Sequence, residues 1–180
     1  MTDSKSALIL LKEGNMRFVR GQSRNLPRDT SETRRLLAEN GQSPYAVVFG
    51  CSDSRVPPEI IFNAGLGEIF TVRNAGNVAD AVALGSVEYA ALHLGAKLVV
   101  VLGHTSCGAV AAAVSGEDLG QNIKAITDKI KAPEESNVKN TVSELLKSPA
   151  LGKLKAVGEL DIIGAKYDLI TGEVTFFDEN

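Results

Sequence analysis

Two cysteines and a histidine stand just beyond two apolar runs of the chain. Residues 46–49 lead through a single glycine into Cys51, and residues 98–102 lead through another into His104, with Cys107 three residues later. If these runs are neighbouring strands, about 4.8 Å apart, the three side chains can converge on one point. Two thiolates and an imidazole are zinc ligands, and three protein ligands leave the fourth position open for water. The sequence therefore predicts one zinc ion per chain.

Two other interpretations of these residues stay open. The cysteines could be small buried hydrophobes beside a hydrogen-bonded loop histidine, which the shared position just beyond two buried strands argues against. They could also form a redox dithiol, but Cys51 and Cys107 are 56 positions apart and the chain has no C-x-x-C motif. Cys107 is also expected to begin a helix, whose dipole would favour its thiolate.

Asp53 and Arg55 lie two positions apart in the turn that follows Cys51. A guanidinium can hold a carboxylate with two hydrogen bonds, although such a pair on an open surface adds almost nothing to stability. Beside a metal ligand, the carboxylate can accept a hydrogen bond from a zinc-bound hydroxide, or it can coordinate the metal and close the site. Arg55 would compete with zinc for the carboxylate. It would also help to set the working pH, because zinc with two thiolates and a neutral imidazole is formally neutral.

The elements that must position these residues alternate between strand and helix. Apolar, β-branched runs without polar alternation predict a mainly parallel sheet buried on both faces, with crossover helices between its strands. The chain is expected to end in a hairpin over 167–177, which turns at Thr171-Gly172 and supplies an edge strand, and 132–136 is expected to be a polar loop. The remaining predicted elements are strands at 45–49, 69–72, 98–102 and 160–163 and helices at 58–64, 79–94, 109–114, 122–131, 138–146 and 150–157.

The first forty residues predict a helical arm rather than part of the sheet. Residues 6–20 have a helical apolar pattern with a break at Gly14, and residues 29–40 start with N-cap candidates and stop before a glycine. The arm has few large side chains, so we expect it to pack on the main body or on a neighbouring subunit. All 180 residues should then form one domain, with the arm at 1–40 and an α/β core at 45–177.

Composition excludes several classes of protein. The chain is 44% hydrophobic and 23% charged, which is too apolar for intrinsic disorder, and its net charge of -3 argues against a nucleic-acid or polybasic membrane surface. No run of 18 uncharged apolar residues predicts a membrane span, and the apolar stretch 7–11 ends at Lys12 without a cleavage site. We therefore expect a cytoplasmic protein whose cysteines stay reduced.

At the residues of the predicted metal site the sequence resembles the β-class carbonic anhydrases. The resemblance implies an α/β fold, zinc held by Cys51, His104 and Cys107, and Asp53 and Arg55 as the catalytic pair. It further implies the reversible hydration of carbon dioxide to bicarbonate and a proton, and an obligate dimer or higher assembly. The motifs stand in family order between about residue 8 and residue 177: Cys51-Ser-Asp-Ser-Arg55-Val-Pro-Pro, Arg73-Asn-Ala-Gly-Asn77, Gly85-Ser-Val-Glu-Tyr89 and Gly103-His104-Thr-Ser-Cys107-Gly108.

The resemblance also implies a substrate pocket of the plant-like type. Gln42 lies nine residues before the first cysteine, where plant-type members have a substrate-facing glutamine, and Phe70 and Tyr89 match the aromatic positions of that pocket. Gly108 is the fourth position assigned to the substrate. In the family the first three reach the site from across the dimer interface, so the implied partner is a second copy of the chain, in a homodimer or a tetramer.

Other functions share these motifs. Relatives of the family hydrolyse carbonyl sulfide or carbon disulfide with the same zinc ligands, so this activity is the alternative to carbon dioxide hydration. A non-catalytic zinc-binding or bicarbonate-sensing protein is a further alternative. Asp53 and Arg55 argue against it, because a structural zinc site more often fills its fourth position with Cys or His.

Overall fold

A computed structural model describes residues 2–22, 30–117 and 119–177, and its centre is a five-stranded sheet in the order β2-β1-β3-β4-β5. The first four strands are parallel and the last is antiparallel to its neighbour, which confirms the mainly parallel sheet and the C-terminal hairpin. The strands are β1 (Ala46–Cys51), β2 (Ile69–Asn74), β3 (Leu98–His104), β4 (Asp161–Tyr167) and β5 (Val174–Phe176).

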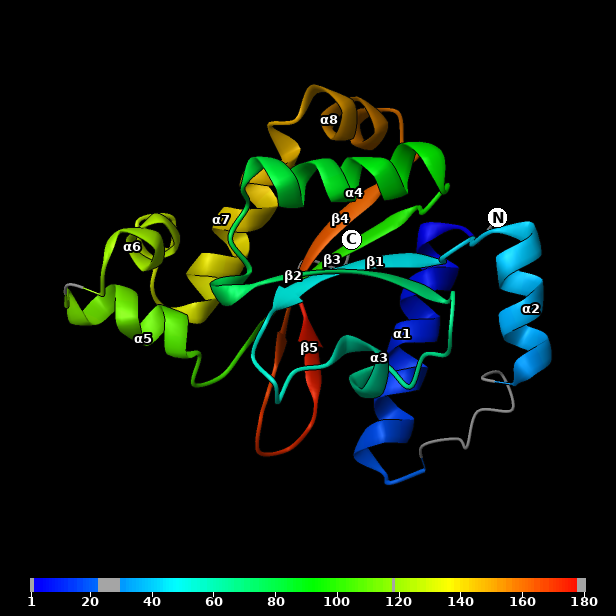
Figure 1. Ribbon diagram of the computed structural model, residues 1–180, viewed down its shortest axis with the longest axis horizontal. Helices are drawn as coiled ribbons and strands as arrows, with labels where there is room; N and C mark the ends of the chain where they lie inside the picture. The colour runs from blue at the N-terminus through cyan, green and yellow to red at the C-terminus, as the bar shows by residue number, and fades with distance from the viewer. Residues whose placement is uncertain (1, 23–29, 118, 178–180) are drawn as a thin grey trace.

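Helices cover both faces of this sheet (Figure 1). One face carries α4 (Ala81–His93), α7 (Glu134–Leu146) and α8 (Pro149–Ala156), and the other carries α1 (Ser4–Val19) and α3 (Pro58–Ile61). Both central strands, β1 and β3, are buried along their whole length, with alternate side chains in the two cores. Their sequences are therefore continuously apolar, as expected for strands that lie between two helical layers.

The predicted break at Gly14 is wrong, because α1 continues through this residue. A Cβ at Gly14 would lie 1.9 Å from the carbonyl oxygen of Phe62, so the glycine is there for a close approach to the end of α3. Ala7 and Leu11 bury α1 in the core on that face of the sheet. The first helix of the predicted arm thus belongs to the main body.

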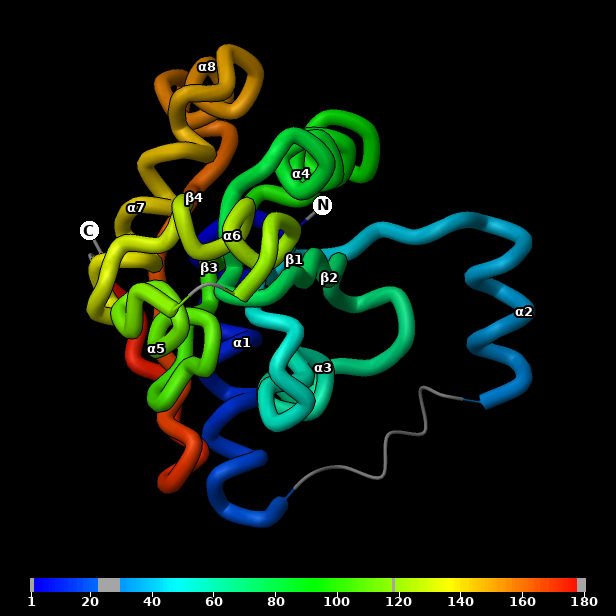
Figure 2. Tube along the Cα trace, turned by 60° about the vertical axis from the view of Figure 1, so that its left-hand side comes forward, coloured from blue at the N-terminus to red at the C-terminus, as the bar shows by residue number. Residues whose placement is uncertain are grey.

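The second helix of the arm behaves differently. In the part of the chain that the structure describes, α2 (Ser31–Asn40) buries none of its residues; it lies to the side of the sheet in Figure 2, with Leu37 near Gly67 in the loop before β2. The Thr30 side chain caps it by accepting a hydrogen bond from the Thr33 N–H. The predicted start at residue 29 lies outside the described residues.

The remaining elements differ from the predictions in three places, one of which is the expected helix 122–131, which ends at Thr127. The expected loop 132–136 is mostly helix, because Pro133 is followed at once by the first turn of α7, where two glutamates favour a helix N-terminus. The expected helix 58–64 is only the single turn α3, and Asn63 beyond it has a φ of 47°. The other helices are α5 (Gly108–Ser115) and α6 (Gln121–Thr127), and none of the described helices is long and apolar enough to cross a membrane.

Candidate metal centre

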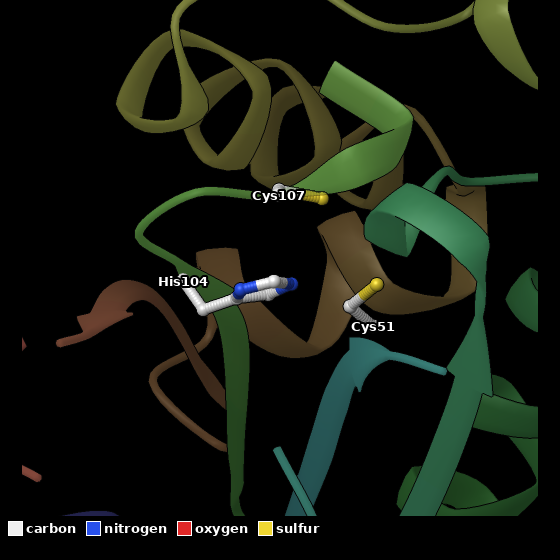
Figure 3. Close-up of side chains that lie close together, drawn as sticks. All are labelled: Cys51, His104 and Cys107. Atoms are coloured by element: carbon white, nitrogen blue, oxygen red, sulfur yellow. The ribbon is translucent and has the colours of Figure 1, made fainter. Parts of the chain in front are cut away.

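Cys51, His104 and Cys107 come together at one end of the sheet. Cys51 is the last residue of β1, His104 is the last residue of the adjacent parallel strand β3, and Cys107 is the N-cap of α5. Their side chains point toward one another in Figure 3, and their ligand atoms all lie within 4.8 Å of each other. All three residues are buried. The strand pairing that the sequence predicts therefore produces the predicted cluster.

His104 shows that the cluster fits a metal ion. Its Nδ1 donates to the carbonyl oxygen of Thr105 at 2.9 Å, which leaves the lone pair on Nε2. Within the described residues this buried Nε2 has no hydrogen-bond partner. A buried nitrogen without a partner is costly, whereas a cation between it and two sulfurs satisfies it. Two sulfurs and an imidazole suit zinc rather than magnesium or calcium.

The two sulfurs of the metal-free cluster share one proton. The neighbouring Cys107 thiol, helped by His104 and by the Gly76 N–H, lowers the pKa of Cys51 to about 4. The Cys51 thiolate and burial raise the pKa of Cys107 far above its usual value. Burial opposes the charging of His104, but the Cys51 thiolate and the Thr105 carbonyl outweigh it and raise the pKa of the imidazole. Cys51 is thus favoured as a thiolate, the form of cysteine that binds a metal.

Asp53 and Arg55 form a close ion pair beside the cluster. The Arg55 Nε and Nη2 donate to the two carboxylate oxygens of Asp53 at 2.9 and 2.6 Å, and the Arg55 backbone N–H adds a third bond at 2.9 Å. This pairing holds the pKa of Asp53 well below its usual range. Asp53 Oδ2 lies 3.9 Å from His104 Nε2, so an ionised carboxylate faces the point where a metal would sit.

Arg73 holds the turn that carries these residues, a role that sequence reasoning missed. From β2, its Nε donates to the carbonyl oxygen of Cys51 at 2.9 Å and its Nη2 donates to that of Asp53 at 2.7 Å. Arg73 is part of a family motif, but no pattern in the sequence signalled this role: the residue lies just past the expected strand 69–72, and its acceptors are 22 and 20 residues away in the chain.

Gln42 does not reach the cluster of its own chain. It is an exposed residue before β1, whereas Cys51 ends that strand, and six strand residues span about 20 Å. Gly108, by contrast, directly follows Cys107 at the first position of α5. Of the four residues assigned to the substrate, only Gly108 adjoins the cluster through its own chain.

Phe70 and Tyr89 pack on each other, away from the cluster. Phe70 pairs with Val47 near the start of β1, while Asn74 pairs with Cys51 at its end. Four strand residues place Phe70 about 13 Å from that end. Its ring lies 6.5 Å from the half-exposed Tyr89 ring on α4. The two aromatic side chains thus form a surface beside the edge strand β2.

Comparisons with known proteins agree with this geometry. A family model described as "Carbonic anhydrase" matches residues 46–133. Carbonic anhydrase 2 of Mycobacterium tuberculosis is 41% identical over 198 aligned positions, which cover 98% of this chain and 94% of that protein. A carbonic anhydrase of Mycolicibacterium smegmatis is 42% identical, and the match covers 91% of this chain and 88% of that protein.

Solved structures show the same fold. A tetrameric β-carbonic anhydrase of Sordaria macrospora superposes with a TM-score of 0.74 at 25% identity, covering 92% of this chain and 94% of that one. A Coccomyxa β-carbonic anhydrase in complex with acetazolamide gives a TM-score of 0.72 at 27% identity, covering 98% of this chain and 87% of the other. The buried Cys-His-Cys cluster, the sheet and these relatives together show that the chain belongs to the β-carbonic anhydrase family of enzymes.

Proposed function

We propose that this chain is a zinc enzyme that catalyses the reversible hydration of carbon dioxide to bicarbonate and a proton. The observation that carries the proposal is the buried cluster of Cys51, His104 and Cys107 with the Asp53 carboxylate 3.9 Å from His104 Nε2. The arrangement provides three groups that could hold zinc and a fixed anion beside them. The relatives that share 41% and 42% of the sequence are named carbonic anhydrases, which supports the same activity here.

The metal cluster and the Asp53–Arg55 ion pair would contribute different parts of the chemistry. Zinc held by the three ligands would supply Lewis acidity, which makes water a nucleophile near neutral pH. Asp53 stays ionised at working pH because Arg55 lowers its pKa, so its Oδ2 can only accept a hydrogen bond from the attacking oxygen and orient it. Arg55 keeps both carboxylate oxygens occupied. Without Arg55 on these oxygens, the Asp53 carboxylate would be free to help hold the metal itself.

The substrate pocket is completed by a second copy of the chain. Gln42, Phe70 and Tyr89 lie away from the cluster of their own chain but on exposed or partly exposed surface, where a partner can receive them. In a homodimer, Gln42 would donate a hydrogen bond to one oxygen of carbon dioxide, and the two rings would line an apolar pocket. Gly108 lies beside the cluster from its own chain. The active unit is therefore at least a homodimer.

Carbon dioxide hydration by stopped flow, on protein of measured zinc content from about pH 7 to about pH 9, tests this function. Wild-type protein should hold one zinc per chain and hydrate carbon dioxide far faster than buffer. Cys107→Ser should lose zinc and activity together, because a serine hydroxyl is a poor zinc ligand. Asp53→Asn should keep zinc and lose about 100-fold or more in kcat, the usual contribution of a positioned acid-base group.

The same assay decides between the family's chemistries. Carbonyl sulfide and carbon disulfide, offered side by side with carbon dioxide, should be turned over slowly or not at all. Zinc-loaded protein that hydrolyses a sulfur substrate but leaves carbon dioxide untouched would move the assignment to that hydrolase. A Cys107→Ser protein with full zinc and full rate would overturn the ligand assignment.

A further inference from the structure

Helix α7 has polar side chains on the face that packs toward the metal cluster, and two of them are buried. Glu134, Asn137 and Thr141 are spaced three and four residues apart, so they share one face of the helix. Asn137 and Thr141 are each only 1% exposed, next to the fully buried Val138. Buried amides and hydroxyls cost free energy unless they are hydrogen-bonded, so their partners indicate why they are there.

Both buried side chains hold the same short turn. Asn137 Nδ2 donates to the carbonyl oxygen of Gly76 at 2.8 Å, and Thr141 Oγ1 donates to that of Asn77 at 2.9 Å. Asn137 Oδ1 also accepts from the Lys131 N–H at 3.2 Å, which ties the segment before α7 to the same residue. The 3₁₀ turn η2 (Ala75–Asn77), which follows β2, is thus fixed from the α7 side.

That turn reaches a ligand of the cluster. The Gly76 N–H donates to Cys51 Sγ at 3.3 Å. Gly76 has a φ of +72°, and a Cβ there would lie 2.8 Å from Ile130 Cδ1, so the turn has little freedom to shift. At the other cysteine, the Cys107 N–H donates to Glu134 Oε1 at 3.4 Å. One face of α7 is therefore linked to both cysteines. It reaches Cys51 through the η2 turn, and it reaches Cys107 directly through Glu134.

We propose that Asn137 is a positioning residue of the metal centre: it holds the Gly76 carbonyl, so that the Gly76 N–H stays on the Cys51 sulfur and slows release of the metal. This inference rests on the zinc site of the proposed function. Partners of metal ligands orient the ligand atom, and their loss commonly lowers metal affinity by about 10- to 100-fold. Thr141 acts on the same turn through the next carbonyl and should have a smaller effect.

Zinc release to a chromophoric chelator, followed by absorbance on zinc-loaded protein, tests the proposal. Asn137→Asp keeps the size of the side chain and the oxygen that accepts from Lys131, but removes the N–H donated to Gly76. We expect zinc to leave this variant about tenfold faster than wild type. In cobalt-loaded protein, the sulfur-to-cobalt charge-transfer band should shift, because one sulfur loses its hydrogen bond.

Asn140→Asp is the matched control, since Asn140 lies on the same helix and its side-chain amide donates to the Lys129 carbonyl rather than to the η2 turn. It should release zinc at the wild-type rate. Thr141→Val removes a single hydroxyl and should accelerate zinc release severalfold. If Asn137→Asp does not fold, Thr141→Val tests the proposal in its place. A purely structural role would lower the urea midpoint of metal-free protein and leave the release rate unchanged.

Two results would overturn the proposal, and only one of them would also overturn the proposed zinc site. Wild-type protein that binds no zinc would overturn the proposed zinc site together with this inference. Wild-type protein that holds one zinc per chain, with folded Asn137→Asp and Thr141→Val variants releasing it at the wild-type rate, would overturn the inference alone. Faster release from both variants, with the control unchanged, supports it.

Discussion

Two buried sulfurs this close together cannot both be ionised unless a cation lies between them. The pKa of Cys51 falls to about 4, while that of Cys107 rises because its thiol hydrogen-bonds to the Cys51 thiolate. The pKa of His104 is also raised, because the adjacent negative charge outweighs its burial. At neutral pH, without a cation between the sulfurs, Cys107 therefore keeps its proton, and the raised pKa of His104 favours a proton on the imidazole as well. A zinc ion must displace these protons in order to bind.

This proton count predicts how zinc affinity depends on pH. Because Cys107 gives up a proton on binding, the affinity should rise by at least about tenfold per pH unit through the neutral range, and more steeply at lower pH, where His104 must also deprotonate. Competition titration against a chelator at several pH values measures the slope, and calorimetry in buffers of different ionisation enthalpy counts the protons. A wild-type affinity independent of pH would contradict this account of the cluster.

At the scale of elements, the contact between α1 and α3 depends on a missing side chain. Gly14 lets α1 lie against the Phe62 carbonyl, and the next residue, Asn15, donates to the carbonyls of Ile61 and Gly172 and accepts from the Val174 N–H. One helical turn thus connects the N-terminal helix, α3 and the C-terminal hairpin. Any side chain at position 14 would have to push α1 away from the end of α3.

Gly14→Ala should therefore destabilise the protein, although alanine favours helix by about 1 kcal/mol over glycine. The added Cβ would overlap the Phe62 oxygen, and overpacking of this kind typically costs about 1–3 kcal/mol in the free energy of unfolding. Urea unfolding of the zinc-loaded protein measures the difference. Met16→Ala, an exposed substitution on the same helix, should change stability by less than about 0.5 kcal/mol. A Gly14→Ala protein as stable as wild type would show that α1 can move away from α3 at no cost.

Elements were predictable from the sequence where burial and local pattern agree. The runs at β1 and β3 are apolar because helices cover both faces of the sheet. The positions of these two strands, their pairing and the meeting of Cys51, His104 and Cys107 could therefore be predicted from the apolar pattern. Gly14 was misjudged because its local preference to break a helix is outweighed by a tertiary contact. The roles of Arg73 and Asn137 were not predictable, because each acts through hydrogen bonds to carbonyl groups far away in the sequence.

At the scale of the whole molecule, one side of the described structure carries apolar surface beside an edge strand. Strand β2 is the outer strand of the sheet, and α4 beside it exposes an apolar stripe formed by Val82, Tyr89 and Leu92. A helix stripe of this kind is normally covered. Phe70 and Tyr89, two of the three residues that we propose line a partner's substrate pocket, lie on this side. Association through this face would therefore both bury the stripe and complete the active site.

Val82→Lys should consequently separate the subunits and stop catalysis without removing zinc. Val82 is 80% exposed, so a lysine there leaves the isolated chain intact but places a charge in the proposed interface. Analytical ultracentrifugation should show the mass of one chain, with zinc retained and carbon dioxide hydration reduced at least about 100-fold, because Gln42, Phe70 and Tyr89 no longer reach a cluster. Ile170→Lys is the control: Ile170 is 95% exposed in the turn before β5, and its replacement should alter neither mass nor rate. A monomeric Val82→Lys protein with full activity would mean that one chain builds a complete site by itself, and a Val82→Lys dimer would place the interface on another face.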